Sequence, residues 1–170
     1  LQITPNIIKI HCIFRIHRDT RFSKDKTPYK THCSANIAAG GKKSGDPGLY
    51  VHADAHTLRI GGGAYWVDKE DLYMLRERMA SNPQTFNDLI QETAFSERYG
   101  HVLGERNARL PKEFQEAATV CPHLYNKQFY FMAELPAQLL LSDALIDEVM
   151  AHFDAAAPLR AYLKAGLQAG

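Results

Sequence analysis

LYVHADAHTLRIGGG, residues 49–63, is the stretch of this chain that most constrains its fold. Apolar and polar residues alternate in both halves of the stretch, and a period of two predicts two strands. Ala55 and His56 lie between the halves and predict a tight turn, so we expect the two strands to pair as a hairpin. The glycines at 61–63 predict a bend or a close approach between backbones where the second strand ends.

Upstream of the hairpin, the sequence predicts further extended structure. Apolar residues at positions 8, 10, 12, 14 and 16 predict a strand over 8–17, whose other face carries basic and histidine side chains. The polar stretch that follows contains Pro28 and predicts a loop, and extended chain is predicted to return over 29–38. Residues 40–48 predict a flexible surface connection into the hairpin.

Downstream of the hairpin, the period of the apolar residues changes to that of a helix. Asp68 predicts the N-cap of a helix that begins at Lys69. Asn82 followed by Pro83 predicts the start of a second helix that reaches about Glu92.

The last third of the chain adds extended chain over 100–111 and a strand over 128–135. Two further helices are predicted, one from Ser142 and one after Pro158. Strands therefore concentrate early and helices late, which predicts an α+β fold with a mostly antiparallel sheet from the N-terminal half, packed by C-terminal helices. We expect residues 1–170 to form a single domain, because the length suits one domain and no linker is visible.

Composition excludes several classes of protein. Hydrophobic residues make up 45% and charged residues 23%, as in ordinary globular chains, and no apolar run approaches a bilayer span. Cys12, Cys33 and Cys121 are scattered without a CxxC spacing, which favours reduced thiols and a cytoplasmic location. No signal peptide is visible, and because the chain enters a predicted strand almost at once without a methionine, we expect the natural protein to begin earlier.

Positive charge is concentrated near the N-terminus. Residues 9–43 hold nine Lys and Arg against two Asp, whereas the other residues hold eleven against seventeen Asp and Glu. This asymmetry favours a local anion site over a protein that coats nucleic acid.

The segment RIHRDTRFSKDKTPYKTH, residues 15–32, carries most of that charge. Arginine grips phosphate or carboxylate with two parallel N–H groups, lysine adds mobile charge, and tyrosine and histidine add hydrogen bonds. We expect a small phosphate or carboxylate ligand here, with Asp19 orienting an arginine. The candidate ligand-binding residues are Arg15, Arg18, Asp19, Arg21, Lys24, Asp25, Lys26, Tyr29, Lys30, His32 and His52.

Three other interpretations remain open. The arginines and aspartates can form an internal ion-pair network in a scaffold or interaction domain without enzymatic activity. Phe14, Phe22, Tyr29 and Tyr50 among the cations fit nucleic-acid binding less well, because the whole chain is nearly neutral. An enzyme also stays open, with His11 or His32 as acid or base, although no nucleophile or phosphate-loop motif is present.

A metal or other cofactor is not expected. His52, Asp54 and His56 form an HxDxH pattern of the residue types that bind zinc. The predicted turn at Ala55 and His56 would direct His56 away from the other two, so we expect His52 to be a hydrogen-bonded residue of the site or the sheet.

The basic segment resembles the motif of the microbial family known as domain of unknown function 2461, which occurs in bacteria and fungi. The resemblance rests on Arg-x-x-Arg-Asp-x-Arg-Phe-x-x-Asp-Lys-x-x-Tyr over residues 15–29 and continues through the glycine-rich hairpin to the C-terminal helices. His17 and Cys33 depart from the tyrosine and the aromatic residue common in the family. The resemblance implies a further helical segment before the first strand, which we expect to precede residue 1 of this sequence, and it implies no established activity.

Overall fold

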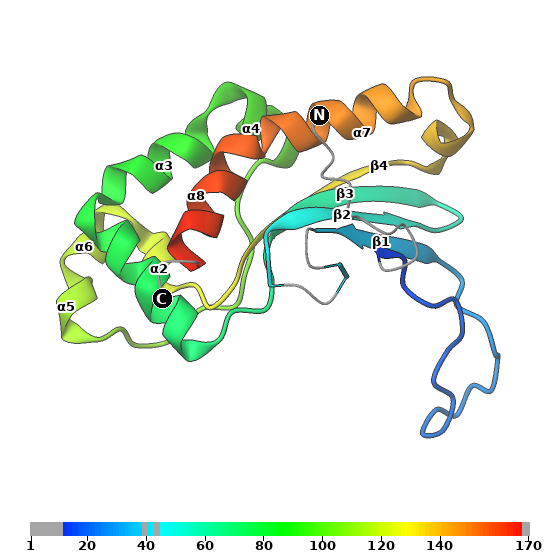
Figure 1. The fold of residues 1–170 in the computed structure, drawn as a ribbon, viewed down its shortest axis with the longest axis horizontal. Coiled ribbons are helices and arrows are strands. Elements are labelled where there is room, and N and C mark those ends of the chain that lie inside the picture. Colours follow the sequence, from blue (N-terminus) through cyan, green and yellow to red (C-terminus); the bar gives the residue numbers. More distant parts are fainter. Residues whose placement is uncertain (1–11, 39–40, 43–44, 168–170) are drawn as a thin grey trace.

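A four-stranded antiparallel sheet organises this chain, with strand order β1-β2-β3-β4. The computed structural model describes residues 12–38, 41–42 and 45–167. The strands are β1 (Cys33–Ile37), β2 (Gly48–Ala53), β3 (Thr57–Ala64) and β4 (Phe129–Pro136). Helices gather on one side of this sheet and at one of its ends, so the α+β prediction is confirmed (Figure 1).

Most helices lie between β3 and β4 in the sequence or follow β4. They are α2 (Lys69–Ser81), α3 (Pro83–Gln91), α4 (Thr93–Tyr99), α5 (Lys112–Gln115), α6 (Ala117–Val120), η1 (Pro122–Tyr125), η2 (Ala137–Leu141), α7 (Leu145–Ala155) and α8 (Ala157–Leu167). None of the helices in the described segments is both long enough and apolar enough to span a bilayer.

One face of the sheet is buried beneath helices. Leu58 and Ile60 of β3 are fully buried and pack with apolar residues of α7. Phe131 of β4 joins the larger core that the helices build around Leu75 and Phe86. Because side chains alternate along a strand, the residues between these apolar ones point to the opposite face of the sheet.

That opposite face carries three rows of residues paired across the strands. One row is Ser34, His52, Arg59 and Glu134; the next is Asn36, Tyr50, Gly61 and Met132; the third is Gly48, Gly63 and Tyr130. We call this side the open face, because the helices cover the other one (Figure 1).

The local signals in the sequence predicted the main elements well. The hairpin of β2 and β3 turns at Ala55 and His56, as predicted. Asp68 caps α2 by accepting hydrogen bonds from the backbone N–H groups of Glu70 and Asp71. Pro83 is the first residue of α3, although the side chain of Asn82 makes no capping bond.

The strand predicted over 8–17 is wrong for its described part, residues 12–17. There Ile13 bridges Ala35 and His17 bridges Tyr29, each as an isolated antiparallel bridge. These bridges differ in register by two residues, since four residues on one side correspond to six on the other, and no continuous ladder forms. Residues 8–11 lie outside the described part. The short helices α4, α5 and α6 were not predicted.

Candidate functional site

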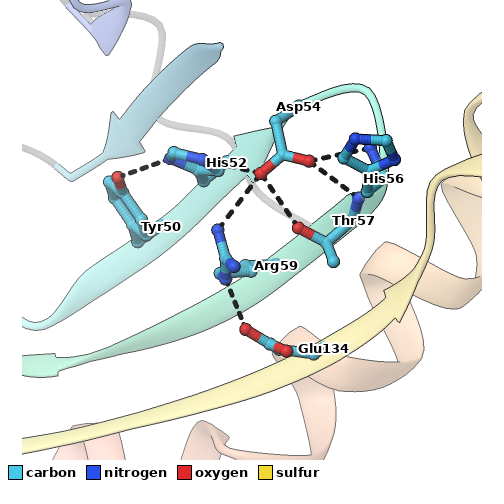
Figure 2. Close-up of polar contacts among 7 residues, drawn as sticks. All are labelled: Tyr50, His52, Asp54, His56, Thr57, Arg59 and Glu134. Carbon is cyan, nitrogen blue, oxygen red and sulfur yellow. Dashed lines mark hydrogen bonds and ion pairs between the residues drawn. The ribbon is translucent and has the colours of Figure 1, made fainter. Parts of the chain in front are cut away.

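A polar network occupies the open face where the hairpin turns (Figure 2). Asp54 follows β2 and accepts hydrogen bonds from the backbone N–H groups of His56 and Thr57 at 2.8 and 2.9 Å, and from the Thr57 hydroxyl at 3.0 Å. These backbone donors favour the carboxylate and hold the pKa of Asp54 well below its usual range. Asp54 is therefore a fixed negative charge at the end of the hairpin.

Arg59 joins this turn to β4. Its Nη1 lies 3.3 Å from Asp54 Oδ2, and its Nε donates to Glu134 Oε1 at 2.5 Å. The guanidinium thus bridges two carboxylates from different elements, and the Glu134 contact is the main reason that the pKa of Arg59 is raised. Because both carboxylates pair with Arg59, we do not count this arginine among the cations that could bind an anionic ligand.

His52 links the network to the middle of the open face. Its Nε2 lies 3.6 Å from Asp54 Oδ2, and its Nδ1 lies 3.4 Å from the Tyr50 hydroxyl. The His32 ring stacks on the His52 ring with centroids 4.5 Å apart. Burial lowers the pKa of His52, and the positive charges of His32 and Arg59 lower it further. In the tautomer that carries its proton on Nε2, toward Asp54, the Nδ1 atom of His52 would accept a hydrogen bond from the Tyr50 hydroxyl.

Next to Tyr50, a cavity of about 390 Å³ opens on the same face. Five aromatic side chains line it, together with glycines and with polar side chains that include Lys42 and Asp46. Residues that line it include Phe14, Asn36, Lys42, Tyr50, Tyr65, Trp66, Tyr130 and Met132. The volume lies within the range of small-ligand pockets.

The basic segment forms a loop that projects from the edge of the sheet beyond β1, away from the helices (Figure 1). We call residues 15–30 the basic loop. Arg21 makes two hydrogen bonds to Asp19, at 3.0 and 2.7 Å, and Arg18 pairs with Asp25. The contact with Arg21 lowers the pKa of Asp19.

Further hydrogen bonds close the basic loop. Asp25 also accepts from the hydroxyl and the backbone N–H of Thr27, and these contacts together with Arg18 hold its pKa below the usual range. Lys26 donates to the backbone carbonyl of Thr20 at 2.8 Å. The loop therefore has internal structure of its own.

A family model described as "Conserved hypothetical protein (DUF2461)" matches residues 1–162. The chain belongs to this family. The description of the DUF2461 family names no reaction, ligand or partner. No curated protein and no solved structure matches the chain.

In this DUF2461 chain, the eleven candidate residues fall into two groups. Nine of them belong to the basic loop, where the Tyr29 ring lies tilted against the His17 ring with centroids 5.0 Å apart. The other two, His32 and His52, stack on each other on the open face. No contact in the described part of the chain joins the histidine pair to the arginines of the loop. That the two groups form one site therefore stays a prediction.

Several residues of the open face were not singled out from the sequence as a site. Arg59 and Glu134 are 75 positions apart, so nothing local marks them as partners. Trp66 and Tyr65 follow β3 directly, and the one tryptophan of the chain was a signal that could have drawn attention to them. In the HxDxH pattern, His56 contacts Asp54 through its backbone N–H. No group of three potential metal ligands converges among the described residues.

Proposed function

We propose that the basic loop recognises an anion that carries two or more phosphate or carboxylate groups. The observation that carries this proposal is an excess of charge. Residues 15–30 hold six Lys and Arg against two Asp, which leaves a net charge of +4 on one projecting loop. The ion pairs of Arg18 and Arg21 use both aspartates of the loop.

The cations of the loop divide by role. Arg18 and Arg21 hold the shape of the loop through their aspartates. The charge in excess comes from Arg15, Lys24, Lys26 and Lys30. Tyr29, half exposed beside them, supplies a hydroxyl donor. His32 and His52 lie on the open face near the base of the loop and would contact the part of the ligand that reaches the sheet.

The exposure of the loop favours a ligand with several charges over a single small ion. Arg15, Lys24 and Lys26 are exposed to water, where each charge pair contributes little and salt screens it. Several anionic groups on one molecule sum these weak contacts. Binding should therefore weaken steeply as salt is added.

The test compares the thermal unfolding midpoint in tripolyphosphate with that in sodium chloride of equal ionic strength. A ligand at 100 times its dissociation constant stabilises a protein by about 2.7 kcal/mol. We expect this stabilisation in the unchanged chain and its loss in the triple variant K24Q/K26Q/K30Q. The matched control replaces three exposed lysines outside the basic loop, K69Q/K112Q/K164Q, and should still be stabilised by tripolyphosphate. Equal midpoints in both salts would contradict the proposal and favour a scaffold or interaction domain.

Single-stranded nucleic acid is a second candidate ligand. Phe22 is 96% exposed in the basic loop and Tyr29 is 54% exposed, so each ring offers exposed surface on which a base can stack. Binding of oligo(dT) with a slope of log K against log salt of about −3, as four phosphate contacts give, would support this candidate. Tripolyphosphate binding without oligo(dT) binding would exclude it.

A further inference from the structure

The cavity on the open face owes its floor to glycines that face one another. Gly48 of β2 pairs with Gly63 of β3, and both glycines line the cavity beside Tyr130. Neither glycine can be replaced at low cost. A Cβ on Gly63 would lie 2.2 Å from the Phe129 carbonyl oxygen, and its φ of 99° disfavours other residues. Neighbouring backbone thus requires both glycines, and neither position adds a side chain to the cavity.

Aromatic rings form the walls of this cavity. The Tyr65 ring packs edge to face with Trp66 at 5.3 Å and with Tyr130 at 5.1 Å, and Phe14 packs against Tyr50 at 6.5 Å. Trp66 remains 80% exposed and Tyr65 49% exposed. A stacked ring would bury this apolar surface, and stacking on aromatic side chains suits any base-like heterocycle.

One polar group of the lining can read the edge of such a ring. The half-buried Asn36 side chain lies on the open face beside Tyr50, and its Nδ2 donates to the Lys42 carbonyl at a long 3.5 Å. A carboxamide offers one donor and one acceptor, the combination that matches the N6 and N7 edge of adenine. On the other side, His52 holds the hydroxyl of Tyr50 and fixes the orientation of its ring.

From these observations we infer that the cavity binds an uncharged planar nitrogen heterocycle of purine type, which packs against Tyr65 and Trp66 and is read by Asn36. This site is separate from the basic loop and does not depend on the anion proposed for it.

Trp66 is the single tryptophan of the chain and reports on this cavity directly. The probe is adenosine, which carries no charge and does not absorb at an excitation wavelength of 295 nm. The titration is run in 0.5 M sodium chloride, where the Debye length is only a few ångströms and loop electrostatics are suppressed. Failure of the basic loop to bind anions therefore leaves this result unchanged.

We expect saturable quenching of Trp66 fluorescence by adenosine and a Kd raised about tenfold in Tyr65→Ala, as loss of one stacking ring gives. Asn36→Ala should also weaken binding. The matched control is Tyr73→Ala, which removes a tyrosine of similar exposure from α2. Circular dichroism of each variant checks that it folds.

Three outcomes would overturn the inference. They are no saturable change with adenosine, saturable quenching by maltose but not by adenosine, and adenosine binding that is unchanged in Tyr65→Ala. The second would indicate a carbohydrate, and the third a site elsewhere on the chain.

Discussion

Asp54 accepts four hydrogen bonds from the three residues His56, Thr57 and Arg59, and so closes the hairpin turn with a single carboxylate. The same carboxylate faces Nε2 of His52. One side chain thus fixes both the turn and the orientation of the histidine beside the cavity.

Acid should weaken the fold through Asp54. Because backbone N–H groups hold its pKa below the unfolded value of about 3.9, its contribution to stability is complete above that pH. The contribution is lost as pH falls toward the pKa of the folded state. We expect Asp54→Asn to lower the urea midpoint at pH 7 and to flatten the decline between pH 4 and 2, relative to Asp143→Asn at an exposed position. Equal pH profiles for the two variants would refute this role.

Arg76 is a buried arginine that donates hydrogen bonds to backbone carbonyl oxygens. It is 6% exposed, and its guanidinium donates to the carbonyl oxygens of Leu124 at 2.9 Å and Asn126 at 3.1 Å. Arg76→Met would leave these buried carbonyls without a donor, so we expect the free energy of unfolding to fall by about 2–4 kcal/mol. Chemical denaturation measures it, with exposed Arg109→Met as control. A loss no larger than that of the control would mean that water satisfies the carbonyls.

Among the elements, α2 and α8 pack most closely where α8 carries Gly166. A Cβ on Gly166 would lie 2.7 Å from Leu75 Cδ1, and Leu75 is fully buried. The glycine is therefore a requirement of the packing between the two helices.

Gly166→Val should separate these helices. We expect it to lower the free energy of unfolding by about 1–3 kcal/mol, because the added methyl groups overpack the contact. Ala165→Val places the same side chain on the exposed side of α8. We expect it to lower the free energy of unfolding by less than about 0.7 kcal/mol, the difference in helix propensity. Similar losses in the two variants would show that the contact tolerates the bulk.

Elements with local signals were predictable from the sequence, and the others were not. The alternation in residues 49–63 predicted the hairpin, and Asp68 predicted the start of α2, because both signals act within a few residues. Residues 12–17 show the same alternation but do not form a strand, because their bridges to 29–35 shift register. Alternation alone does not reveal such a shift.

At the scale of the whole molecule, one part of the candidate site was predictable from local sequence signals and the other part was not. The sequence indicated the basic loop because its cations and aspartates are neighbours in the chain. The Arg59–Glu134 pair and the aromatic cavity depend on β4 returning beside β3 after an excursion through helices α2–α6 and η1. Contacts across that distance follow from strand register, which a single sequence does not specify here.

One isolated backbone bridge lies at each border of the sheet. Ile13 bridges Ala35 on the outer side of β1, and Leu103 bridges Tyr130 on the outer side of β4. An uncovered border strand offers its unpaired amides and carbonyls to other chains. A strand from a second copy would meet residues 12–17 and the lysines of the basic loop at the border of β1, and Leu103 at the border of β4. Each bridge interrupts the row of backbone groups at its border, so a strand from a second copy could pair along the full border only by displacing Ile13 or Leu103.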